Sequence, residues 1–284
     1  MSIWGFPLKD STTGWECRFK SDVPLFVRLF WPKSRELRWK WKKILVRLDE
    51  LSQTRPGLKS AKAQWSIREA DLSGYMPYEP VMDIDLRLAS PEVVNAELQR
   101  RIDQQAGRIG ELRKLVAPWG ISLDGEIASI DELSLWFSAY LHLFTKKEFL
   151  AHVRDNKDPH CDPYQHRAPV VWYSIALDIS LYMMSMLQST CPSVRWGVSK
   201  QKPDWTPLYN RPVLYYATTN NADADFESHL WALMPLLSHD YWTRKTSLYL
   251  RHEYKKSLTA CQRLIKKEKA KSNAQIGPIS FDRS

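Results

Sequence analysis

The residue types best suited to chemistry gather in one stretch, DPHCDPYQH at positions 158–166. Its possible metal ligands are His160, Cys161, Asp162 and His166. A Cys and a His are also the pair that a thiol nucleophile requires. Metal sites usually take spaced pairs of ligands, whereas the first His and the Cys are adjacent here, so their side chains diverge in an extended chain. We therefore interpret the stretch as a polar connection without metal or cofactor, and keep a metal-dependent enzyme centred on it as an alternative.

Three helices are predicted around this connection. Residues 90–116 form an amphipathic pattern with Ser90 at the N-cap and a proline in the first position. Residues 129–144 follow with Ser129 as the cap, and 168–192 are almost wholly apolar. The polar stretch 158–166 thus joins the second helix to the third.

The period then changes from helix to strand. Residues 193–200 and 211–219 are rich in β-branched and aromatic side chains and predict an antiparallel pair. Helical spacing returns at 226–242, and a long amphipathic helix at 243–271 has one apolar face, formed by Tyr254, Leu258, Cys261 and Ile265. Strands do not alternate with helices, so we expect an α+β fold, mainly helical, with one small antiparallel sheet packed on a helix layer.

The composition divides the chain into three parts. Residues 1–80 are expected to be an N-terminal extension that carries a basic amphipathic helix at 34–53. The prolines and glycine within 57–89 predict an irregular linker to a main α+β domain at 81–240. Residues 241–284 are expected to be a basic C-terminal helix followed by a tail.

Positive charge is concentrated in two helices of this 284-residue chain, whose net charge is +9. Between 244 and 271, ten Lys/Arg face two Glu, a local charge of +8, and between 33 and 47, seven Lys/Arg face one Glu, a local charge of +6. Such patches favour encounters with a polyanion or an acidic protein. The C-terminal patch is assigned to Lys255, Lys256, Arg263, Lys266 and Lys267. Tyr249 and Tyr254 beside it would allow base stacking on a single strand.

Two further features suggest a partner-binding surface. Asp178 lies inside the apolar third helix, where a carboxylate needs a buried partner or a polar face. We expect that partner to be Arg195, Lys200 or Arg211. The second strand carries side chains of the types that anchor protein interfaces, Tyr209, Arg211, Tyr215 and Tyr216.

Cysteine usage and hydropathy suggest a compartment. Four cysteines at 17, 161, 191 and 261 form no CxxC pair, so we expect free thiols in a reducing cytoplasm. No apolar run approaches the roughly 20 residues that span a bilayer, and the first residues lack the pattern of a signal peptide. A cytoplasmic location is the resulting expectation.

Residues 84–237 carry a series of motifs, ELRKLVAPWGI, SIDELSLWF, WYSIALDISLYMMSMLQSTCPSVRW and NRPVLYY. In this order they resemble uncharacterised bacterial α+β proteins of the domain-of-unknown-function type, some of which are immunity-type or accessory proteins near secreted toxins. The resemblance implies a bacterial origin and a similar fold. The chain departs from that pattern at 183–185, where Met-Met-Ser stands in place of a Gly-Glu pair.

No GxSxG, P-loop, GxGxxG or HExxH motif occurs in the sequence. The preferred hypothesis is therefore a non-enzymatic bacterial protein that binds another protein, as an immunity or accessory factor for a toxin or secretion system. The first alternative is a nucleic-acid-associated protein that uses the basic helices 33–47 and 244–271. The second is the metal-dependent enzyme centred on 158–166.

Overall fold

The computed structural model describes residues 2–3, 6–7, 33–67, 70–72, 74–79, 86, 88–141, 170–199, 210–216, 222–224, 226–227, 230 and 249–275. The polar stretch 158–166, with His160, Cys161, Asp162 and His166, lies outside these residues, as do Tyr209 and most of the predicted helix 226–242.

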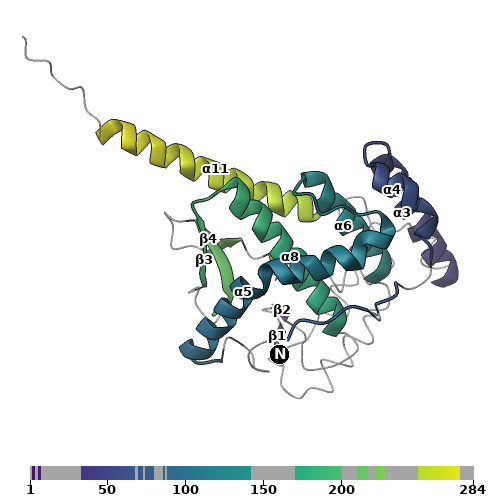
Figure 1. Cartoon of the computed structure of the whole chain (residues 1–284), viewed down its shortest axis with the longest axis horizontal. Helices are drawn as coiled ribbons and strands as arrows, with labels where there is room; N and C mark the ends of the chain where they lie inside the picture. Colours follow the sequence, from purple (N-terminus) through teal and green to yellow (C-terminus); the bar gives the residue numbers. More distant parts are fainter. Residues whose placement is uncertain are drawn as a thin grey trace, which may run out of the picture.

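Helices account for most of the described chain (Figure 1). They are α3 (Lys33–Ser52), α4 (Pro56–Ala61), α5 (Pro91–Val116), α6 (Ile127–Tyr140), α8 (Val170–Thr190) and α11 (Tyr249–Gln275). Two short 3-10 turns, η2 (Lys62–Gln64) and η3 (Ala117–Trp119), follow α4 and α5. The predicted α+β fold, mainly helical, is confirmed. No helix within the described ranges carries an apolar stretch sufficient to cross a membrane.

The sheet is antiparallel, in the order β3 (Val194–Val198), β4 (Pro212–Tyr216) and β5 (Ala222–Ala224). The predicted pairing of the first two strands is confirmed, and both pack on α5. The third strand was not predicted, because three residues of the sequence ADA carry no strand signal. A separate pair of two-residue strands, β1 (Ser2–Ile3) and β2 (Phe6–Pro7), lies near the N-terminus.

The starts of α5 and α6 show how local signals set the helices. α5 begins at Pro91, as predicted, since a proline at the first position loses no helical hydrogen bond. α6 begins at Ile127, so the prediction that Ser129 caps it is wrong. Ser129 lies inside the first turn, where its hydroxyl donates to the Glu126 carbonyl (2.6 Å) and lies 2.6 Å from the Tyr182 hydroxyl.

An aromatic cluster around Tyr140 of α6 joins the N-terminal helices to the rest of the core. The ring of Tyr140 lies 5.3 Å from that of Trp119, 5.7 Å from Trp41, and 6.0 Å from both Trp65 and Trp136. The Trp119 indole also donates a hydrogen bond to the Tyr140 hydroxyl (2.8 Å). Such ring pairs add to the free energy gained by burying the rings.

This cluster shows that the described part of the predicted N-terminal extension packs on the main domain. Trp41 belongs to α3 and Trp65 follows η2, yet both lie in the same continuous core as α5, α6 and α8. The boundary expected at residue 80 therefore does not mark a break in packing. The first part of the expected irregular linker is helical, because it belongs to α4 and η2.

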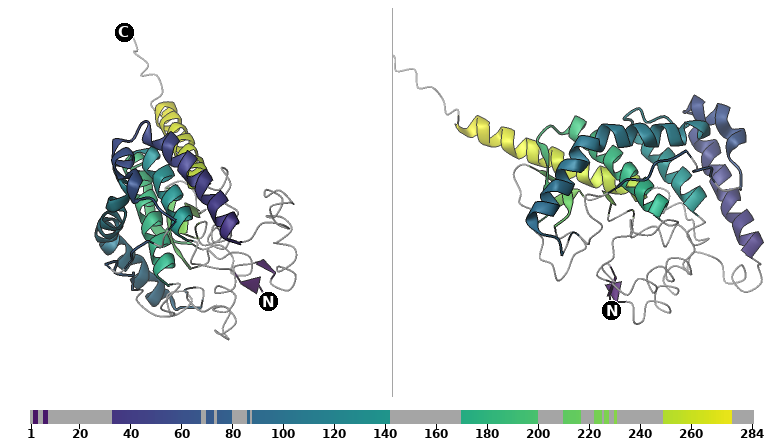
Figure 2. Two further views of the ribbon diagram at one scale, coloured as in Figure 1. Left: turned by 90° about the vertical axis from the view of Figure 1, so that its right-hand side faces the viewer. Right: turned by 60° about the horizontal axis from the view of Figure 1, so that its bottom comes forward.

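The helices form a layered body with α11 extending from it. In Figure 1, α5 and α8 cross the middle of the molecule, α3 and α4 lie at one end, and the sheet lies toward the other. α11 packs on α6 and α8. Its C-terminal half then continues past the body, as both views in Figure 2 also show.

Two glycines allow α4 to approach the end of η3 backbone to backbone. Gly120 has a φ of 73°, in the left-handed region, and a Cβ at this position would lie 2.1 Å from the Gly57 carbonyl oxygen. A Cβ on Gly57 would in turn lie 2.6 Å from the Gly120 oxygen. Gly125 also has a positive φ, of 84°, but a Cβ there would meet no atom within 4 Å.

Gly120→Ala is therefore expected to lower the free energy of unfolding by about 3 kcal/mol or more, since backbone strain and overlap with Gly57 add together. Gly125→Ala is the matched control, because it introduces strain of the same kind without an overlap, and should cost about 1–2 kcal/mol. Urea unfolding of both variants measures the difference. Equal losses would show that the close approach of α4 to Gly120 is not a constraint.

Candidate functional site

The structure presents α11 as the best candidate for a binding element, because one face is docked and the other is basic and exposed. Leu250, Tyr254 and Cys261 are buried, and Leu258 and Ile265 pack partly against the core. The apolar face predicted for this helix is confirmed. The spacing of three or four residues keeps these side chains on one side, which turns the remaining positions to solvent.

A buried carboxylate of α6 holds the N-terminal part of α11. Arg251 pairs with Asp131 at 2.8 Å, and Arg47 of α3 lies 3.9 Å from the same carboxylate. Burial raises the pKa of the Asp131 carboxyl, although the charges of both arginines lower it. The two basic helices are thus tied to one acidic group.

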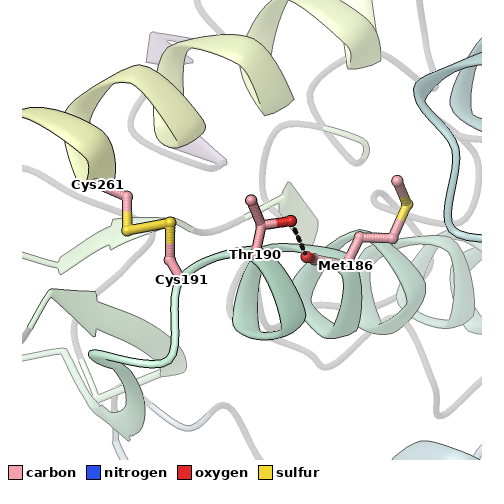
Figure 3. The surroundings of a disulfide bond; sticks show 4 residues. All are labelled: Met186, Thr190, Cys191 and Cys261. Atoms are coloured by element: carbon pink, nitrogen blue, oxygen red, sulfur yellow. Dashed lines mark hydrogen bonds between the residues drawn. A yellow bond between two sulfur atoms is a disulfide. The ribbon is translucent and has the colours of Figure 1, made fainter. Parts of the chain in front are cut away.

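A disulfide holds the middle of α11. Cys191, the residue after the last one of α8, is bonded to Cys261, and both side chains are fully buried (Figure 3). The expectation of free thiols is therefore wrong for these two cysteines. Seventy positions separate them, and only the packing of α11 on α8 brings them together. No local spacing in the sequence signals this pair. Thr190 beside it donates a hydrogen bond to the Met186 carbonyl (2.9 Å), which closes the last turn of α8.

The opposite face of α11 carries the predicted basic patch. Lys255, Lys256, Arg263 and Lys266 are exposed, and the Lys267 side chain lies outside the described residues. Within the helix, eight Lys/Arg stand against two Glu, a charge of +6. The C-terminal part of the helix extends past the body (Figures 1 and 2). This arrangement offers a projecting row of cations to an anionic surface.

The base-stacking role considered for the tyrosines of α11 does not hold for Tyr254. Its side chain is 2% exposed and its ring packs 6.3 Å from that of Phe226. Burial raises the pKa of its hydroxyl. A ring in this position contributes to docking of the helix and cannot reach a nucleotide. The side chain of Tyr249 lies outside the described residues.

The strand expected to anchor a partner is arranged differently from the prediction. β4 lies between β3 and β5, so it is the central strand and not an edge. Arg211 is buried, and the ring of Tyr215 lies against Gly197, where an added Cβ would come 2.7 Å from it. The Tyr215 hydroxyl donates to the Val198 carbonyl (2.5 Å). Tyr215 therefore stabilises the sheet and Arg211 is largely hidden from a partner, whereas the side chain of Tyr216 lies outside the described residues.

Asp178 is a buried structural residue and not a surface contact. Two nitrogens of Arg108 donate to its two carboxylate oxygens, at 2.8 and 2.6 Å, and the Tyr75 hydroxyl donates to it as well. The prediction that Arg195, Lys200 or Arg211 pairs with Asp178 is wrong, because α5 packs along α8 and supplies the cation. Arg108 also donates to the Met76 carbonyl (2.7 Å), so the cluster fastens the segment 74–79 to both helices.

A second arginine of α5 repeats this arrangement seven residues earlier. Arg101 pairs with Glu97 (2.8 Å) and Glu227 (2.5 Å), and the Tyr78 hydroxyl donates to Glu97 (2.8 Å). Arg101 and Arg108 were not selected from the sequence. Their seven-residue spacing places them on one face of the helix, and this was the available signal.

The electrostatics of the Asp178 cluster follow from burial. Burial raises the pKa of the Asp178 carboxyl to about 6, against the hydrogen bonds and charge of Arg108 and the hydrogen bond of Tyr75. Burial also lowers the pKa of Arg108, but Asp178 outweighs that effect, so the arginine pKa lies above its ordinary value. At neutral pH both groups are charged and the pair is complete.

Comparison of the chain with family models, curated proteins and solved structures found no match in any of the three. Among the described side chains, no group of three or more His, Cys, Asp or Glu is placed to hold a metal ion. The candidate stretch 158–166 lies outside the described residues.

Asp178→Ala is expected to lower the free energy of unfolding by roughly 3–5 kcal/mol, because it leaves the buried donors of Arg108 and Tyr75 without their acceptor. The double variant Arg108→Met/Asp178→Ala should cost about 1–3 kcal/mol less than the sum of the single variants. Lys114→Met, which breaks the exposed pair with Glu111 on the same helix, is the control and should cause no resolvable change. Additive losses at the buried pair would contradict the assignment.

The same cluster predicts a pH dependence. The folded-state pKa of Asp178 lies above its ordinary value of 3.8, so the protonated carboxyl is favoured by folding. Its contribution to stability is complete below about pH 4 and is lost as the pH rises through about 6. The stability of the parent protein relative to Asp178→Asn should therefore fall between these values in urea unfolding. A relative gain over that interval would contradict the raised pKa.

Proposed function

We propose that this chain acts by binding another protein, and that the exposed basic face of α11 contacts an acidic surface on that partner. The observation that carries the proposal is the division of α11 into two faces. One is fastened to the body by Arg251, by the apolar residues and by Cys261, and the other presents Lys256, Arg263 and Lys266. The body therefore holds the cations in a fixed array, which reduces the entropy lost on binding.

An acidic protein suits this surface better than a nucleic acid strand does. Four of the exposed side chains described on α11 are cationic, Lys255, Lys256, Arg263 and Lys266, whereas His252 is the one exposed ring among them and Tyr254 is buried. Recognition of single strands relies on exposed aromatic rings as well as cations, whereas an acidic protein surface requires cations alone. Duplex DNA, bound through its phosphates, is the second candidate, because exposed cations on a projecting helix can contact phosphates as well as carboxylates.

A narrower form of the proposal is an immunity or accessory role beside a bacterial toxin or secretion system. It rests on the resemblance of the 84–237 motifs and on the charge of α11, which would complement an acidic toxin. The genes next to this one test it: a neighbouring toxin gene supports the role, and its consistent absence argues against it. Metal analysis of the purified protein addresses the enzyme alternative at 158–166, since stoichiometric zinc or iron would favour that alternative.

The binding surface itself is tested with the triple variant Lys256→Gln/Arg263→Gln/Lys266→Gln. Three exposed ion pairs at about 0.5 kcal/mol each correspond to roughly a tenfold loss of affinity for a fluorescent 20-residue glutamate peptide. Lys59→Gln/Arg113→Gln/Lys114→Gln is the matched control, because it removes the same number of exposed lysines and arginines from α4 and α5. Its affinity should remain at the parental value.

A labelled 20-base-pair duplex, titrated in parallel from 50 to 200 mM salt, separates the two candidates. Tighter binding of the glutamate peptide than of the duplex at 150 mM salt supports the protein partner. Tighter binding of the duplex, with a steep salt dependence that the α11 variant flattens, would replace it with nucleic acid. Equal losses in the α11 variant and its control would remove α11 as the binding surface.

A further inference from the structure

The disulfide lies at the point where α11 leaves the body. Cys261 is fully buried, and Ile265 is the one described side chain beyond it that packs against the core. The helix continues to Gln275, and its last turns extend past the body (Figures 1 and 2). The covalent link therefore sits at the base of the projecting segment, 262–275.

The projecting segment has little of its own to keep it helical. A helix of fewer than about 15 residues is marginally stable in water without tertiary contacts. The sequence of 262–275 carries five Lys/Arg against one Glu, a charge of +4, and like charges at helical spacing destabilise a helix. The helicity and direction of 262–275 therefore depend on the fixed turn around Cys261, from which the helix propagates.

The N-terminal half of α11 is anchored differently. Leu250 and Tyr254 are buried, and Arg251 pairs with Asp131. These non-covalent contacts do not involve the cysteines and remain after reduction. Loss of the disulfide should then release the C-terminal half while the rest of α11 stays docked.

We propose that the Cys191–Cys261 disulfide is a thiol-sensitive clamp, and that its reduction frees the projecting half of α11 and weakens binding of an acidic partner. The effect on binding rests on the function proposed above, but the clamp does not. The reductant is a small thiol of the glutathione class. One glutathione thiolate attacks a sulfur of the disulfide and forms a mixed disulfide, which releases the other cysteine as a thiolate that takes up a proton.

A second glutathione completes the reaction. It attacks the mixed disulfide, releases the remaining cysteine and leaves as oxidised glutathione, so two glutathione thiols supply the two electrons that the disulfide accepts. Both cysteine side chains are fully buried, so α11 must lift locally before the first attack.

The experiment compares two variants in oxidised and in reduced glutathione buffer. Cys17→Ser/Cys161→Ser keeps the clamp and removes the other two thiols, and Cys191→Ala/Cys261→Ala removes the clamp. Alkylation and intact mass report the redox state, and amide hydrogen exchange reports local order. Reduction should accelerate exchange within 262–275 about tenfold in the first variant and leave the amides of α8 unchanged.

The clamp-free variant should exchange fast in both buffers. Affinity for the 20-residue glutamate peptide should fall about threefold to tenfold on reduction in the first variant alone. Equal exchange of 262–275 in both redox states, or two alkylated cysteines in the oxidised first variant, would overturn the clamp. Redox-dependent exchange without glutamate binding in either state would instead overturn the proposed function and the regulatory part of this inference.

Discussion

Three carboxylates buried in this helical core each meet a cation from another element, because an unpaired charge cannot remain buried at neutral pH. Asp178 of α8 meets Arg108 of α5, Glu132 of α6 meets Arg55 at the start of α4, and Asp131 of α6 meets Arg251 of α11. Each pair joins two elements that are distant in sequence. These pairs therefore fix which helices are neighbours, whereas apolar packing alone would allow the helices to slide past one another.

The position of α11 follows from this constraint. Arg251 fixes one end of the docked face, and the apolar residues continue it as far as the turn that holds Cys261. Beyond that turn, Ile265 is the one described side chain that still packs against the core, and Lys266 is exposed. The element with the greatest local positive charge is thus also the one that extends furthest from the core. This combination of a rigid base and an exposed cationic end supports a binding role for α11.

Local signals in the sequence were sufficient to predict most helices and the strands β3 and β4. Ser90 and Pro91 marked the start of α5, and the β-branched residues marked β3 and β4. The N-cap of α6 was placed three residues late, because the side chain of Asp124 already accepts a hydrogen bond from the Glu126 amide and turns the chain. A long helix was also anticipated at 243–271 from its apolar spacing, and α11 is described from Tyr249 to Gln275.

The site was less predictable because its residues meet only in the folded chain. The partner of Asp178 was sought among the strands, since sequence order suggested them, whereas α5 supplies it through helix packing. The disulfide joins cysteines that no motif connects. Tyr215 lies in β4 and Arg211 directly precedes it, and β4 is central only because of β5, which the sequence did not predict. Predictions based on exposure failed where a neighbouring element covers the residue.

The central claim is that α11 is the surface that meets an acidic partner. The most direct test is a hydrogen-exchange footprint of the oxidised protein with and without a saturating 20-residue glutamate peptide. The account predicts slower exchange within 255–271 and unchanged exchange in α3, whose basic residues provide an internal comparison. Protection confined to α3 or to the sheet, with 255–271 unchanged, would contradict it.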